Sequence, residues 1–223
     1  EWTLQQQGFN YTYDKRLLDR LHQPVLENIK SHLHAALDFQ QASARFLENH
    51  DEDRSRSFFS SDQAQAAAII TYTVPGMRFF YQGQWEGRRL RLPVQLGREP
   101  QEINQQQQLK LTDTALSQLP MLDIVDPVMA AFYDKLLRLL RLPLLRQGHW
   151  GRVELGPKHL LAWQWQWQST ICLIVINYEP HTTAFRLPHT KNNWQYFDQA
   201  QEVEVSSHQH LVAYEYLILL RED

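Results

Sequence analysis

The stretch 45–54 holds the residue types that could do chemistry. Two apolar residues, Phe46 and Leu47, lead into a run of polar and charged side chains that includes His50 and Asp51. The pattern predicts a buried strand that ends in an acidic loop. In a barrel of alternating strands and helices, active sites lie at the carboxyl ends of the strands. The stretch is therefore a candidate active site, and a solvated loop without a function is the alternative interpretation.

A metal-dependent phosphohydrolase built on His50 and Asp51 is a second alternative, and it would need further histidines nearby. His32 and His34 lie on one predicted helix, but a spacing of two residues sets them about 200° apart around its axis. They cannot converge on one ion, and His22 is expected at the surface. The sequence therefore predicts no metal site and no cofactor.

Composition excludes several classes of partner. The net charge is −3, so no basic surface for nucleic acid or an anionic membrane is expected. No apolar run reaches the roughly 18–20 residues that span a bilayer. The single cysteine, Cys172, allows no intrachain disulfide and fits a reducing compartment, so a cytoplasmic location is expected. Oligomeric state stays open.

Strand and helix signals alternate in the first part of the chain. Large aromatic side chains at 9, 11 and 13 predict a strand, which Asp14 follows as a helix cap. Pro24 is expected to begin a second helix that runs to about residue 37. Ser60 and Gln63 fit a capping box at the start of an alanine-rich helix, and 77–81 reads as another buried strand. This alternation predicts parallel βα units and an α/β fold.

The pattern changes towards the carboxyl terminus. Residues 98–120 lack periodicity and predict a long connection, and Asp126-Pro127 then begins an amphipathic helix. From residue 148 short apolar strands alternate with turns, which predicts an antiparallel β-sandwich and a domain boundary at 147/148. Trp163, Trp165 and Trp167 alternate with glutamines. They form either the inner face of this sandwich or a platform for sugars, and burial is the favoured interpretation.

Several of these segments together resemble one known family. Residues 46–51 resemble the Phe-x-x-Asn-His-Asp strand end of the α-amylase superfamily, glycoside hydrolase family 13. Residues 74–83 resemble its last barrel strand, 132–137 the helix that closes the barrel, and 11–17 its sixth strand and following helix. The resemblance implies the C-terminal portion of a (β/α)8 TIM barrel, strands six to eight, over residues 1–147. It also implies an antiparallel β-sandwich domain over 148–223.

The resemblance also implies roles for individual residues. Asp51 would be the carboxylate that stabilises the transition state of a retaining enzyme, and His50 would bind the same sugar hydroxyls. Asn49, Tyr81 and Gln84 would be further substrate-binding residues, although the usual acid near Gln84 is missing. Arg54 would fix the loop through Glu52 or Asp53.

The nucleophile and the acid/base would precede Glu1. The expected function is therefore hydrolysis or glycosyl transfer on α-linked glucans by a longer chain, with the 223-residue segment alone inactive. The alternative is a non-catalytic glucan-binding or scaffold module that uses the tryptophan face.

Overall fold

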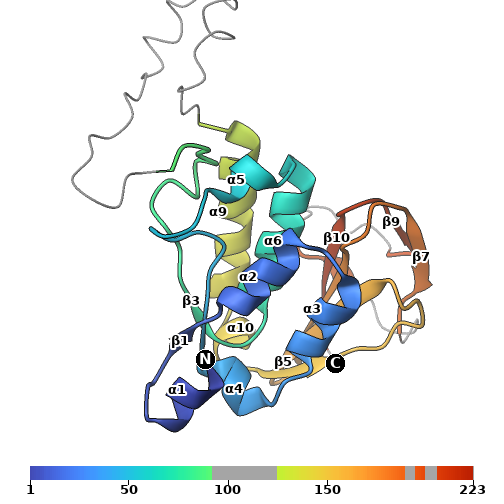
Figure 1. The fold of residues 1–223 in the computed structure, drawn as a ribbon. Coiled ribbons are helices and arrows are strands. Elements are labelled where there is room, and N and C mark those ends of the chain that lie inside the picture. The colour runs from blue at the N-terminus through green and yellow to red at the C-terminus, as the bar shows by residue number, and fades with distance from the viewer. Residues whose placement is uncertain (92–124, 189–193, 199–204, 223) are drawn as a thin grey trace, which may run out of the picture.

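The computed structural model describes residues 1–91, 125–188, 194–198 and 205–222. The predicted connection at 98–120 lies outside the described residues. In Figure 1 the amino-terminal strands lie at the left, the helices α2, α6 and α9 occupy the centre, and the carboxyl-terminal strands form the right-hand part.

Three short parallel strands carry the acidic loop. They are β1 (Thr12–Tyr13), β2 (Ser43–Arg45) and β3 (Met77–Arg78), and they pair in the order β1-β2-β3. Thr12 lies opposite Ser43, and Ala44 lies opposite Met77. Helices connect the strands, as parallel neighbours require. They are α2 (Lys15–His22), α3 (Leu26–Leu33) and α4 (Leu37–Gln41) before β2, and α5 (Ser55–Phe58) and α6 (Ser61–Thr73) after it. The predicted βα alternation is confirmed.

Side-chain caps begin three of the helices as predicted. Asp14 accepts a hydrogen bond from the amide of Leu17 (3.2 Å), and Ser60 accepts one from Gln63 (3.2 Å). Asp126 accepts from Val128 and Met129 at the start of α9 (Pro127–Arg141). Each cap satisfies amides that the first turn leaves without an intrahelical partner.

One helix prediction is wrong, and another helix was missed. The segment from Pro24 to residue 37 is not one helix, because α3 begins at Leu26 and ends at Leu33 before α4 starts at Leu37. An additional helix, α1 (Trp2–Gln6), precedes the first strand and was not predicted. A contact with a distant part of the chain fixes this helix, since Gln5 Nε2 donates to the Ala42 carbonyl at 3.1 Å.

The carboxyl-terminal part is antiparallel. After α10 (Pro143–Gln147), the strands β4, β5, β6, β10 and β8 form one sheet in the order β4-β5-β6-β10-β8, and β7 pairs with β9. The strands of the sheet are β4 (His149–Arg152), β5 (Leu160–Trp167), β6 (Thr170–Asn177), β10 (Tyr216–Glu222) and β8 (Gln195–Tyr196). The strands of the pair are β7 (Thr183–Arg186) and β9 (His208–Leu211). Phe185 and Leu211 of the strand pair share a buried cluster with Leu173 and Leu219 of the larger sheet. The central strand β6 is buried on both faces, which suits its continuous apolar run at 171–176.

The tryptophans of β5 face the helices. Trp163 and Trp165 are 1% and 7% exposed. The Trp163 indole donates to the Thr73 hydroxyl (3.2 Å) and the Trp165 indole to the Thr73 carbonyl (2.6 Å), at the end of α6. The favoured interpretation of a core face is confirmed. A glucan platform made of Trp163, Trp165 and Trp167 is wrong, because the first two rings are buried inside the chain.

A buried charged network ties the helices to β2. Arg45 is fully buried, and its guanidinium donates to the Asp14 carboxylate, to the Gln40 side chain and to the Pro75 carbonyl. His32 Nε2 lies 2.8 Å from Asp14 Oδ2 and 3.3 Å from the guanidinium. Burial lowers the pKa of His32 to about 4, so the imidazole is neutral at pH 7 and donates to Asp14.

Because His32 is neutral in the folded chain, we expect the folded state to lose stability in mild acid. Between pH 6.5 and about 4 the unfolded chain binds a proton at His32 and the folded chain does not, so its contribution to stability falls as the pH falls. We expect the free energy of unfolding to drop by about 2 kcal/mol between pH 7.5 and 5 through this group. Urea unfolding at both pH values measures the drop. His32→Asn should reduce it, whereas replacement of the exposed His34 by Gln should leave it unchanged; an equal drop in all three proteins would contradict the assignment.

At Gly76 the turn before β3 passes close to β2. Its φ is +133°, and a β-carbon there would lie 2.5 Å from the Ser43 carbonyl oxygen and 3.1 Å from Arg45 Cγ. Only glycine fits this position, because both the backbone conformation and the space exclude a side chain.

Candidate active site

The loop that follows β2 presents His50 and Asp51 to solvent. The strand continues in extended pairing, since the Phe79 amide donates to the Arg45 carbonyl at 2.9 Å. The side chains of His50 and Asp51 are 49% and 64% exposed, and His50 Nε2 lies 3.3 Å from Asp51 Oδ2. A histidine and a carboxylate in contact thus stand at the carboxyl end of the middle parallel strand.

Asn49 holds the loop in place. It is buried, and its side-chain oxygen accepts hydrogen bonds from the amides of Asp51 (2.8 Å) and Glu52 (2.9 Å). Such a side-chain-to-backbone turn fixes the local backbone without using the carboxylate of Asp51. That carboxylate therefore stays available to a ligand.

Glu48 forms a buried ion pair beneath the loop. Its Oε1 accepts from the Ser55 amide (3.0 Å) and hydroxyl (2.6 Å), and its Oε2 accepts from Arg54 Nη1 (2.9 Å). Burial raises the pKa of Glu48, and the hydrogen bonds from Ser55 and Arg54 oppose that rise. With both oxygens occupied inside the protein, Glu48 is a structural acid and not a nucleophile.

Arg54 does not pair as predicted. Its partner is Glu48, whereas Glu52 contacts Lys15 (2.9 Å) and Asp53 contacts Arg91 (3.6 Å). The prediction chose the nearest acids in sequence. Arg54 pairs with Glu48 because a buried guanidinium needs a partner that is buried with it.

Arg54 also joins the loop after β2 to the loop after β3. Its Nη1 donates to the Gln82 carbonyl (2.6 Å) and its Nε to the Leu90 carbonyl (3.0 Å). The guanidinium lies 4.7 Å from the centre of the Tyr81 ring, within the range of a cation–π contact. The two loops are therefore positioned by one side chain.

Gln84 lies beneath the surface and does not face a ligand. It is 1% exposed, and its amide donates to the hydroxyls of Tyr72 and Tyr133, both at 2.8 Å. Its oxygen accepts from the Tyr81 amide at 3.3 Å. The predicted substrate contact for Gln84 conflicts with this placement, because its polar atoms already hold Tyr81 and two buried hydroxyls.

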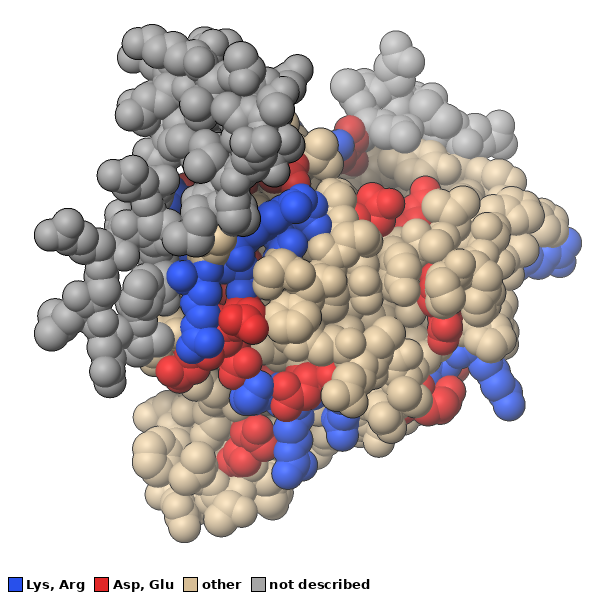
Figure 2. All heavy atoms as spheres, turned by 45° about the horizontal axis from the view of Figure 1, so that its top comes forward, with Lys and Arg blue, Asp and Glu red and all other residues tan. Residues whose placement is uncertain are grey.

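Charges of both signs lie near the site, where Lys15 contacts Glu52 and Arg91 contacts Asp53. On the face drawn in Figure 2, blue and red side chains lie side by side among uncharged residues.

Among the described residues, no group of three or more His, Cys, Asp and Glu side chains is placed to hold a metal ion. In the same part of the chain, no helix is both long enough and apolar enough to cross a bilayer.

The buried partners of the site were missed by the sequence reasoning. Glu48 and Ser55 support the loop, and the available signal was an acid placed directly after the apolar pair 46–47. An acid at a buried position needs charge-assisted partners, so this signal could have predicted a buried pair, although not which arginine makes it.

Comparison with protein families decides the classification. Residues 4–122 match the family model described as alpha amylase, catalytic domain, and this match covers more than half of the 223 residues. The chain belongs to the α-amylase family. The resemblance carried by residues 46–51 and 74–83 is confirmed at this level. A search of curated proteins gives no significant match.

Solved structures of the α-amylase family share the fold. The noncanonic maltogenic α-amylase AmyB from Thermotoga neapolitana is 18% identical (TM-score 0.69), and the match covers 97% of this chain and 52% of that one. An α-amylase from Lactobacillus plantarum is 16% identical (TM-score 0.67), with 99% and 49% covered. The trehalulose synthase MutB from Pseudomonas mesoacidophila MX-45 is 16% identical (TM-score 0.58), with 88% and 47% covered. The chain spans about half the length of these structures.

Proposed function

We propose that this chain is the carboxyl-terminal part of a retaining glycoside hydrolase or transglycosylase that acts on α-linked glucans. Its parallel strands are strands six to eight of a (β/α)8 barrel, and residues 148–223 are the terminal β-domain. The observation that carries the proposal is the position of Asp51, in a polar loop directly after the middle strand of a parallel βα unit, in a chain of the α-amylase family.

The edges of the parallel sheet support the proposal of a partial barrel. Within the described residues, β1 and β3 each pair only with β2, so each has one open edge. Tyr11, Tyr13 and Met77 lie on or beside these strands and are 51%, 46% and 38% exposed. Parallel sheets in α/β proteins are covered on both faces. Further βα units at both edges would close the barrel and cover these side chains.

In this proposal Asp51 acts on the ring of the sugar that is cleaved. Its exposed carboxylate accepts hydrogen bonds from two ring hydroxyls, and these bonds tighten as positive charge develops at the anomeric centre. His50, in contact with Asp51, donates to the same hydroxyls. Tyr81, held under Arg54, lies at the end of the next strand and lines the sugar site.

The covalent chemistry belongs to carboxylates that precede Glu1. One attacks the anomeric carbon, and the other protonates the leaving oxygen and later activates the acceptor. Water as acceptor gives hydrolysis, and a sugar hydroxyl gives transfer, from the same covalent intermediate. Both outcomes remain part of the proposal.

Replacement of Asp51 by asparagine tests the proposal in the longer protein that contains this chain. We expect kcat for reducing-sugar release from maltooligosaccharides to fall about 10²- to 10³-fold, because one charged stabiliser of the transition state is lost. The matched control is Asp53→Asn, which makes the same change on an exposed carboxylate two residues away. A kcat for Asp51→Asn equal to that of the control would overturn the role of Asp51.

The isolated 223-residue chain provides the second arm of this test. We expect it to release no reducing sugar, since two of the three carboxylates lie outside it. Release by the isolated chain that disappears with Asp51→Asn would show instead that the chain holds a complete catalytic site.

A further inference from the structure

A cavity lies at the amino ends of the three parallel strands. It has a volume of about 480 Å³. Tyr11, Gln41 and Gly76, which precede β1, β2 and β3, line it together with residues of α10 and β4. The loop after β2 follows the carboxyl end of its strand and contributes no residue to this lining. The cavity is therefore separate from the candidate active site.

The charged side chains that line this cavity are two arginines. Arg78 comes from β3 and Arg146 from α10, and His149 at the start of β4 adds an imidazole. None of the described lining residues is Asp or Glu. Burial, and then the charge of Arg146, lower the pKa of Arg78, so two like charges lie near each other. Both guanidinium groups keep their charge at neutral pH, because arginine does not lose its proton in proteins.

Neutral groups hold Arg78 in place. Its Nε donates to the Tyr72 carbonyl (2.8 Å) and its Nη2 to the Leu145 carbonyl (2.7 Å). Within the described part of the chain, Arg78 Nη1 and the Arg146 guanidinium make no hydrogen bond and no ion pair. Carbonyl oxygens satisfy an N–H but do not neutralise a cation. Two positive charges in one cavity thus lack a counter-charge, and an anion would supply it.

A third donor beside the cavity has no acceptor. Trp150 of β4 is half-buried and lines the cavity, and its Nε1 is covered without a hydrogen-bond partner among the residues that the structure describes. An indole N–H can only donate, and a covered donor without an acceptor is costly. An oxyanion in the cavity would provide the acceptor that the protein does not.

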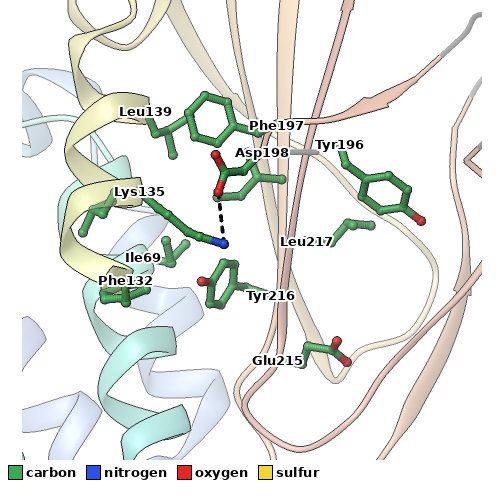
Figure 3. A pocket seen from close by; sticks show the side chains of 12 residues that line it. Ile69, Phe132, Lys135, Leu139, Tyr196, Phe197, Asp198, Glu215, Tyr216 and Leu217 are labelled. Atoms are coloured by element: carbon green, nitrogen blue, oxygen red, sulfur yellow. Dashed lines mark ion pairs between the residues drawn. The ribbon is translucent and has the colours of Figure 1, made fainter. Parts of the chain in front are cut away.

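A cavity of about 430 Å³ between α9 and the carboxyl-terminal sheet provides a contrast. Figure 3 shows its Lys135 extending from α9 towards Asp198, and Lys135 Nζ lies 3.0 Å from that carboxylate. Asp198 lines the same cavity, so this cation already has its counter-charge. Of the two cavities, the one at the amino ends of the parallel strands is therefore the one that favours an anion.

We propose that the cavity at the amino ends of the parallel strands binds a phosphate group. Its donors come from three elements, since Arg78, Arg146 and Trp150 belong to β3, α10 and β4. The oxygens of phosphate point in tetrahedral directions and can accept from all three, whereas a carboxylate presents two oxygens in one plane. Leu37 and Pro75 add apolar lining, which leaves room for an organic group esterified to the phosphate.

Indole NMR of the longer protein that contains this chain, labelled with ¹⁵N-tryptophan, tests the site. Inorganic phosphate is titrated while KCl keeps the ionic strength constant. We expect the Trp150 Nε1–H signal, identified by its loss in Trp150→Phe, to shift downfield and to saturate as the N–H gains an acceptor. Arg146→Gln should raise the Kd about tenfold through the loss of a charged donor.

Arg141→Gln is the matched control, because it removes an exposed arginine at the end of α9 that does not line the cavity. Its Kd should stay within about twofold of the unmodified protein, since distant exposed charges are screened by salt. Thermal unfolding of each variant verifies that the fold is kept. Equal Kd values for Arg146→Gln and Arg141→Gln would overturn the proposal.

Phenyl phosphate distinguishes the two sources of the group. A lower Kd for phenyl phosphate than for inorganic phosphate identifies an ester as the ligand, because its ring would contact Leu37 and Pro75. Equal or weaker binding of the ester identifies the free anion. A Trp150 signal that does not move with phosphate would overturn the site, as would the same shift produced by KCl at equal ionic strength.

Discussion

Arg45→Met is expected to lower the free energy of unfolding by about 3–5 kcal/mol. Arg45 is fully buried, and its guanidinium supplies the charge that compensates the equally buried carboxylate of Asp14. Methionine fills much of the same volume but leaves that carboxylate with only His32 and the Leu17 amide as partners. Breaking one side of a buried pair is costly because the remaining charge has no water to solvate it. Urea unfolding at pH 7 measures the change.

Two further variants distinguish the ion pair from general packing. Arg16→Met removes an exposed arginine that lies 3.3 Å from Glu1, and we expect a change of no more than about 0.5 kcal/mol. The double variant Arg45→Met/Asp14→Asn should recover part of the loss, since asparagine keeps the cap on α2 without a buried charge. If the double variant is as unstable as the sum of both single variants, the ion pair is not the cause.

Trp163→Ala is expected to cost about 3–5 kcal/mol of stability. The ring is 1% exposed, and its indole N–H donates to Thr73 at the end of α6. Truncation removes a large apolar contact and leaves a cavity between the antiparallel sheet and the helices. Thermal and urea unfolding measure the loss.

The control for this variant is Trp2→Ala, since Trp2 is 48% exposed. Its effect should be much smaller, because little apolar surface is removed from water there. A stable Trp163→Ala protein that has lost affinity for maltoheptaose would contradict the burial of this face and return the tryptophans to a binding role.

Local features of the fold were predictable from local sequence. The caps at Asp14, Ser60 and Asp126 were predicted correctly, because each acts on amides two or three residues away. The alternation of Trp163 and Trp165 correctly predicted a buried strand face. The break between α3 and α4 was missed, since the apolar spacing continued across it while the backbone did not.

The site was predictable in position and only partly in its contacts. The acidic loop follows the middle parallel strand as expected, and Asn49, His50 and Asp51 lie together in it. The partner of Arg54 and the burial of Gln84 depend on which side chains the folded chain removes from water, and composition does not encode that. The link between Arg45 and Asp14 joins residues 31 positions apart, beyond the range of any local pattern.

The bare backbone at Gly76 sets a limit on how this protein can diverge. A methyl group there would push the turn before β3 away from the Ser43 carbonyl, and Tyr81 would move with that strand relative to Asp51. The relative position of the loops after β2 and β3 thus depends on the absence of a β-carbon at residue 76. Homologues that keep the same loop geometry should retain glycine here even where every neighbouring residue has changed.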